Sequence, residues 1–131
     1  KTFDARANGY VRGEGCGALL LKLEEKGDIG LGRIIGHAIN QDGRSNGLTA
    51  PNGPSQVRLI REAWNGMESN QVSNIEAHGT GTSLGDPIEV QAISEAIGKG
   101  RSRTTLVIGS AKTNYGHCET AAGVLGVLKV I

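Results

Sequence analysis

The chain has 131 residues, with 14 Lys and Arg against 13 Asp and Glu and a formal net charge of +1. This balance excludes a surface made for general polyanion binding, because nucleic-acid-binding domains usually carry a basic excess. Hydrophobic residues make up 37% and charged residues 21% of the sequence, which is typical of a soluble globular domain. Glycine is the exception at 21 residues, and this excess predicts many tight turns and close backbone approaches.

The first part of the chain contains two candidate strands. Residues Ala18–Leu23 form a continuous apolar run typical of a strand buried on both faces, and Cys16 before it is expected to be a small core residue. Residues Gly32–Ile39 form the second candidate, in which His37 is expected to be structural. The polar segment Asn40–Asn52 follows, and loops of this length are more often functional than not.

A helix and a short strand are predicted next. Pro54 suits the first turn of a helix, and Val57, Ile60 and Trp64 recur at the spacing of one helical face. Residues Asn74–Ala77 then form a short strand candidate that leads directly into a glycine-rich turn.

The start of a second helix is marked by capping signals. Asp86 is predicted to be its N-cap, with Pro87 at the first helical position and Glu89 three residues after the cap. Gly98 is predicted to lie just past its end, at the position where glycine is preferred.

The last part of the chain continues the alternation. Residues 104–109 form a buried strand candidate, and an apolar helix containing Gly123 and Gly126 closes the sequence. Strands that alternate with helices predict an α/β layered fold with a largely buried sheet. The longest apolar stretch, residues 121–131, is too short to cross a membrane. The two cysteines lie far apart, which favours a reducing, cytoplasmic setting over a disulfide scaffold.

Two histidines lie in matching contexts and are the candidate catalytic groups. His78 and His117 each lie beside a glycine in a connection that follows a predicted strand and precedes a helix. Two imidazoles aimed at one point could donate hydrogen bonds to a developing oxyanion, and either could act as a general acid or base. A structural hydrogen-bonding role is the alternative for each of them.

Other kinds of site fit the sequence less well. The histidines have no ligand at metal-like spacing, so no metal site is predicted. The glycine-rich segments match neither the P-loop nor the dinucleotide fingerprint. Cys118 lies beside His117, but catalytic Cys–His pairs meet in space and adjacent residues usually point in different directions.

Four longer motifs carry a family resemblance, and they cover nearly the whole chain. They are FDARANGYVRGEG at 3–15, INQDGRSNGLTAPNGPSQ at 39–56, EAHGTGTSLGDPIEVQA at 76–92 and GSAKTNYGHCETAAG at 109–123. In this order they resemble the C-terminal part of a β-ketoacyl synthase, most of all the ketosynthase domain of a type I modular polyketide synthase. The resemblance implies a thiolase-like α-β-α-β-α fold, here only its latter part. It also implies that residues 1–27 end the N-terminal half of the domain and that 28–131 form most of the C-terminal half.

The resemblance also implies an activity, decarboxylative Claisen condensation of an enzyme-bound acyl thioester with a malonyl-type extender. His78 and His117 match the two catalytic histidines of the family, and Lys112 matches the lysine that helps to order the second one, with Glu119 as an ion partner. Thr80 and Thr82 match threonines that contact the pantetheine arm.

The implied partners are acyl carrier protein, whose phosphopantetheine carries the substrates, a neighbouring acyltransferase domain and a second copy of the parent. No cofactor bound by the domain itself, no nucleic acid and no membrane are implied. The family's nucleophilic cysteine belongs to a motif that precedes the first of the four, so neither Cys16 nor Cys118 matches it. This piece alone is therefore expected not to condense acyl chains. The alternatives are a fatty-acid synthase ketosynthase, a domain that only decarboxylates or passes chains on, and a non-catalytic scaffold half. A shared pocket for the two histidines would argue against the scaffold.

Overall fold

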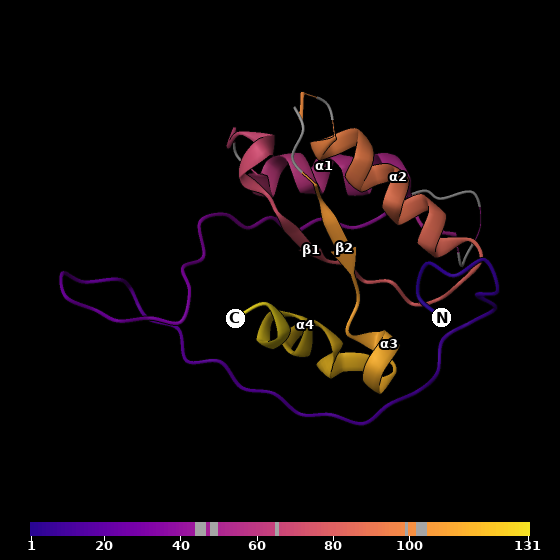
Figure 1. The fold of residues 1–131 in the computed structure, drawn as a ribbon, viewed down its shortest axis with the longest axis horizontal. Helices are drawn as coiled ribbons and strands as arrows, with labels where there is room; N and C mark the ends of the chain where they lie inside the picture. The colour runs from indigo at the N-terminus through magenta and orange to yellow at the C-terminus, as the bar shows by residue number, and fades with distance from the viewer. Residues whose placement is uncertain (44–46, 48–49, 65, 99, 102–104) are drawn as a thin grey trace.

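The computed structural model describes residues 1–43, 47, 50–64, 66–98, 100–101 and 105–131. Its regular structure lies in the second part of the chain (Figure 1). In chain order the elements are α1 (Gly53–Trp64), η1 (Ser69–Gln71), β1 (Asn74–Glu76), α2 (Gly85–Ile97), β2 (Val107–Gly109), α3 (Lys112–Tyr115), η2 (Glu119–Ala121) and α4 (Ala122–Val130).

A short parallel sheet lies between two layers of helices. β1 pairs with β2 in parallel, with Ile75 opposite Ile108. Helices α1 and α2 pack against each other on one side of the two strands, and α4 lies on the other side against β1 (Figure 1). An α/β/α layering of this kind places polar residues at the carboxyl ends of the strands, where α/β folds bind their ligands.

The core is built mainly by the helices and the strand ends. Val57 of α1 is buried, as expected for the inward face of that helix. Ala92, Ile93 and Ile97 of α2 are also buried, and Ala122 begins α4 in a buried position. These apolar side chains stabilise the layers by their removal from water.

Several predicted elements are confirmed. The helix expected from Pro54 is α1, the strand expected at 74–77 is β1, and the closing apolar helix is α4. The strand expected at 104–109 is found at Val107–Gly109, and residue 104 lies outside the described residues. The prediction that this strand is buried is wrong, since Val107 is 55% exposed. Within the predicted loop Asn40–Asn52, residues 44–46 and 48–49 lie outside the described residues.

The two strands predicted in the first part of the chain are wrong. Residues 18–23 and 32–39 belong to no strand, and most of their aliphatic side chains are exposed, with Leu20 at 98% and Ile39 at 89%. This region runs as a wide loop outside the layered body (Figure 1). A strand forms only where a neighbour pairs its N–H and C=O groups, and none of the described residues does so here. Cys16 is exposed too, so its predicted core position is also wrong.

The predicted start of the second helix is wrong in detail. Helix α2 begins at Gly85, so Asp86 lies inside its first turn and is not the N-cap. Asp86 is buried and accepts hydrogen bonds from the backbone N–H groups of Gly81 (3.0 Å) and Phe3 (2.8 Å). Gly98 does follow the last helical residue, but its φ of −69° is not the left-handed conformation that favours glycine.

Candidate active site

Two turns bring the candidate histidines together. His78 lies two residues after the end of β1, and His117 follows the short helix α3 beyond β2. The centroids of their rings are 5.3 Å apart, and the rings meet edge to face at 89°. The two candidate side chains therefore lie in contact, as two imidazoles that act at one point require.

The turn that carries His78 is held by a carboxylate from α2. Glu89 accepts hydrogen bonds from the backbone N–H groups of His78 (2.6 Å) and Gly79 (2.8 Å) through its two oxygens. Gly79 has a φ of +49°, and a Cβ there would lie 2.6 Å from the side chain of Ser110, so only glycine fits the turn. Ser110, which follows β2, donates its hydroxyl hydrogen to the carbonyl oxygen of His78 (3.1 Å). The ends of both strands thus fix this histidine.

Sequence reasoning missed the role of Glu89. The capping pattern predicts that it folds back on the start of its own helix, whereas it lies opposite the turn eleven residues earlier in the chain. The signal was present in the sequence, because an acidic residue in the first turns of a helix can reach backbone N–H groups of the preceding loop. Only the path of the loop decides which N–H groups it meets.

The turn that carries His117 is held by the first part of the chain. His117 donates its backbone N–H to the carbonyl of Val11 (2.7 Å) and accepts from the N–H of Gly13 (2.9 Å), as in a parallel strand pair. Gly116 precedes it with a φ of +80°. The backbone N–H of Glu119 donates to Nδ1 of His117 (2.9 Å). Because Nδ1 accepts, the proton of the neutral ring lies on Nε2, which is then free to donate.

The electrostatic surroundings of His78 favour its neutral form. Partial removal of water by the surrounding chain lowers the pKa of His78 below its usual value of 6.5, and the nearby positive charge of Lys112 lowers the pKa further. The carboxylate of Glu89 acts in the opposite direction and does not reverse the shift. At neutral pH the ring is therefore uncharged and carries one N–H donor.

Lys112 and Glu119 do not form the ion pair that was expected. Glu119 pairs with Arg12, whose Nη1 lies 2.8 Å from Oε1. Lys112 is half-buried, and its amine has no hydrogen-bond partner among the described residues. Lys112 lies close enough to His78 for its charge to lower the pKa of that ring, so its electrostatic effect falls on the first histidine.

Thr80 and Thr82 lie in the loop between His78 and α2. Both are half-buried, and their hydroxyl oxygens are 3.3 Å apart. The hydroxyl of Thr82 also accepts the backbone N–H of Gly85 (3.0 Å), the first residue of α2. The pair therefore lies beside the His78 turn, and Thr82 helps to begin the helix.

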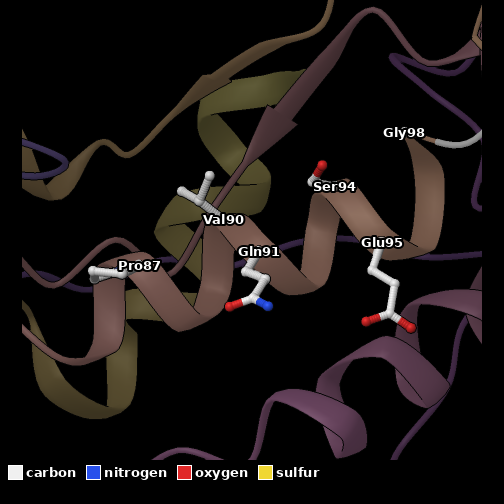
Figure 2. Close-up of a pocket in the computed structure, with 6 residues that line it drawn as sticks. All are labelled: Pro87, Val90, Gln91, Ser94, Glu95 and Gly98. Carbon is white, nitrogen blue, oxygen red and sulfur yellow. The ribbon is translucent and has the colours of Figure 1, made fainter.

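Two hollows of the surface lie along α2 and beside β1 and α4. A shallow groove of about 840 Å³ runs along α2 and presents a single ionisable side chain, Glu95 (Figure 2). A second hollow, of about 650 Å³, is bordered by β1 and α4 and includes His78 and Lys112. His78 borders this hollow and His117 does not. A pocket shared by the two rings stays a prediction. The ring of His117 lies instead against Tyr10, with centroids 5.1 Å apart.

Other candidate groups lie apart from the histidine pair or are covered. Cys118 directly precedes η2 and is buried, with 6% of its surface exposed. No cluster of three or more His, Cys, Asp or Glu side chains that could hold a metal ion occurs among the described residues. Within the same residues, no helix is long and apolar enough to span a membrane.

Comparison with known proteins decides the family. The sequence profile of the β-ketoacyl synthase C-terminal domain matches residues 31–131, and that of the N-terminal domain matches residues 1–27. The chain belongs to the β-ketoacyl synthase family. Over its whole length it is 50% identical to a phenolphthiocerol/phthiocerol polyketide synthase from Mycobacterium tuberculosis and to an erythronolide synthase from Saccharopolyspora erythraea. It spans only 7% and 4% of these two proteins.

Solved ketosynthases share the fold. The ketosynthase from module 6 of the bacillaene synthase of Bacillus subtilis superposes with a TM-score of 0.70 and 47% identity, over 74% of this chain and 18% of that one. A ketosynthase domain for oxazolomycin from Streptomyces albus gives a TM-score of 0.66 at 40% identity, over 72% of this chain and 17% of that one. The predicted fold class is confirmed, because this β-ketoacyl synthase chain forms part of a thiolase-like α/β domain.

Proposed function

We propose that this chain supplies the histidine pair of a polyketide synthase ketosynthase, which performs decarboxylative Claisen condensation. The edge-to-face contact of His78 and His117 carries the proposal, since two imidazole rings whose centroids are 5.3 Å apart can both donate to one substrate oxygen. Two further observations support the proposal. The lowered pKa of His78 keeps that ring neutral, and the hydrogen bond to Nδ1 of His117 leaves the proton of the neutral ring on Nε2.

The reaction begins when the extender's bond to its carboxylate breaks. CO₂ leaves, and the electron pair passes to the thioester oxygen as an enolate, toward which the two imidazole N–H groups would donate. The enolate carbon then attacks the acyl thioester on the nucleophilic cysteine, a C–C bond forms, and the thiolate leaves. Hydrogen bonds that strengthen as the negative charge develops lower the barrier of the decarboxylation step.

The substrates are proposed to arrive on the phosphopantetheine of acyl carrier protein. Thr80 and Thr82 lie in the loop next to His78, where their hydroxyls would contact the pantetheine arm. An acyltransferase domain would load the extender, and the parent would act as a homodimer. The polyketide synthases to which the chain is similar support the carrier protein and the acyltransferase as partners.

The thiol that holds the growing chain is proposed to lie outside these 131 residues. Cys118 follows His117 directly but is buried, and Cys16 is exposed in the outer loop. Incubation of the chain with an acyl thioester should therefore give no stable mass addition. Stoichiometric acylation of Cys118 followed by turnover with malonyl carrier protein would overturn this assignment.

The experiment on the histidines uses the ketosynthase that contains this chain. His78→Ala and His117→Ala should each abolish decarboxylation of malonyl carrier protein, while acylation of the nucleophilic cysteine survives. His37→Ala is the matched control, because His37 is exposed and lies outside the site. Decarboxylation at the wild-type rate in either site variant would overturn the proposed function, and loss of acylation alone would assign the histidines another role.

A further inference from the structure

His117 takes part in a cycle of contacts with residues 10–13, which lie far from it in the sequence, and with Glu119. Its backbone pairs with residues 11–13, and its ring lies 5.1 Å from the ring of Tyr10. The guanidinium of Arg12 lies 5.9 Å from the centre of the Tyr10 ring and pairs with Glu119 at 2.8 Å. The backbone N–H of Glu119 returns to Nδ1 of His117 at 2.9 Å, which closes the cycle of contacts.

One member of this cycle has a strained backbone. Glu119 has a φ of +49°, in the left-handed region that residues other than glycine rarely adopt. Such a conformation persists only where the surroundings hold it in place. It is also the conformation in which the Glu119 N–H meets the histidine ring, so the strain and the hydrogen bond occur at the same residue.

We propose that Arg12 and Glu119 form a positioning pair for His117, a role that rests on the proposed function. The ion pair holds the Glu119 backbone in its left-handed conformation, and the N–H held there fixes the proton of His117 on Nε2. Without the pair, Glu119 relaxes toward a negative φ, and Nδ1 loses its donor. The ring then exchanges between its two tautomers, only one of which presents Nε2–H to the enolate oxygen.

The exposure of the pair is compatible with this role. The Arg12 side chain is 75% and the Glu119 side chain 46% exposed, and ion pairs of this kind add little to global stability. The pair has only to select between two conformations of one residue. Arg12 is already placed for this by its backbone pairing with His117 and by its position over Tyr10.

The test compares alanine with glycine at position 119. Both variants remove the carboxylate, but only glycine adopts a φ of +49° without strain, so only glycine keeps the N–H aimed at Nδ1 without the ion pair. In the ketosynthase that contains this chain, Glu119→Ala should lower kcat for malonyl decarboxylation about five-fold, with KM unchanged. Glu119→Gly should stay within about two-fold of the wild type.

Arg12 provides the second arm of the test. Arg12→Ala should lower kcat about three-fold in the wild type, have no further effect in Glu119→Gly, and be partly rescued by Arg12→Lys. Arg6→Ala is the matched control, since Arg6 forms an exposed ion pair with Asp4 at 2.8 Å and should leave kcat unchanged.

A tautomer measurement separates this proposal from the proposed function. Ring ¹⁵N shifts in histidine-labelled protein should report the Nε2–H tautomer of His117 in the wild type and in Glu119→Gly, and a mixture in Glu119→Ala. Equal kcat and equal tautomer populations in the alanine and glycine variants would overturn the positioning pair. If His117→Ala decarboxylates normally, the proposed function fails, and the ring shifts still decide whether the pair fixes the tautomer.

Discussion

Residues 1–43 and residues 53–131 contain similar aliphatic runs and differ in what covers them. In the second region Ile93 and Ile97 of α2 are almost fully buried between the layers. In the first region Leu20, Leu23 and Ile39 are almost fully exposed, although Leu20 and Leu23 lie in a run as apolar as that of α2. The apolar pattern of a segment therefore indicates which side chains it can bury. Whether they are buried depends on whether another part of the chain packs against them.

The two regions meet at the histidine turns. Gly9 donates its N–H to the carbonyl of Gly81 (2.9 Å), and residues 11–13 pair with His117. The hydroxyl of Thr2 donates to the carbonyl of Gly79 (2.6 Å). The otherwise irregular first region is thus fixed to the layered body by backbone contacts around the candidate active site, so both regions are needed to shape it.

The largest difference between the regions is expected from core truncation. Ile93→Ala should destabilise the chain by about 3 kcal/mol, because it leaves a cavity among α2's buried contacts. Leu20→Ala is the matched control in the first region and should leave the free energy of unfolding unchanged, because its side chain is already in water. Urea unfolding followed by circular dichroism measures both values. Similar losses for the two variants would show that Leu20 is covered in solution.

The fold could be predicted from the sequence where local signals suffice. Helix α1 follows from Pro54 and the spacing of Val57, Ile60 and Trp64, and α4 from its apolar run. Strand pairing could not be predicted in this way, because residues 18–23 have a strand's composition and no partner among the described residues. Strand pairing requires two segments, and the pattern of one segment does not show whether a partner lies beside it.

The candidate site divides in the same way. His78 and His117 could be found from their matching strand–turn contexts, because the carboxyl ends of parallel strands converge. Their supports could not, since Arg12 meets Glu119 across 107 positions of sequence and Phe3 meets Asp86 across 83. Such pairs form only when the whole chain has folded, so the spacing of residues within one segment cannot predict them.

A smaller change in the free energy of unfolding is expected when a Lys–carboxylate ion pair is removed from each of the two regions. Lys129 of α4 pairs with Glu76 of β1 at 2.5 Å, and the Glu76 side chain is only 11% exposed. Glu76 also accepts the backbone N–H of Ala111 (2.6 Å), which ties the α3 turn to the sheet. A double-mutant cycle with Glu76→Gln and Lys129→Met should give a coupling of about 1 kcal/mol, between the values for exposed and buried pairs.

The Lys22–Asp28 pair is the matched control for that cycle. Its atoms lie 2.7 Å apart in the first region, within a turn exposed to water. Lys22→Met and Asp28→Asn should show no measurable coupling in the same unfolding experiment, because solvent screens the pair. A coupling as large as that of Glu76 and Lys129 would mean that the first region is more ordered than its exposure indicates.

The smallest expected effect concerns the charge beside His78, at the junction of the two regions. Lys112→Met removes a positive charge that lowers the pKa of His78, so that pKa should rise. It should stay below 6.5, because burial is the larger cause of the shift and remains. Between the depressed pKa of His78 and 6.5, the unfolded chain binds a proton at this ring and the folded chain does not. The free energy of unfolding therefore rises with pH across this range. Because Lys112→Met raises the pKa of His78 in the folded chain, the pH range should become narrower in the variant. Histidine ring NMR titration measures the pKa, with the exposed Lys26→Met as control. An unchanged or lower pKa in Lys112→Met would mean that this amine does not act on His78, and the neutrality of the ring would then rest on burial alone.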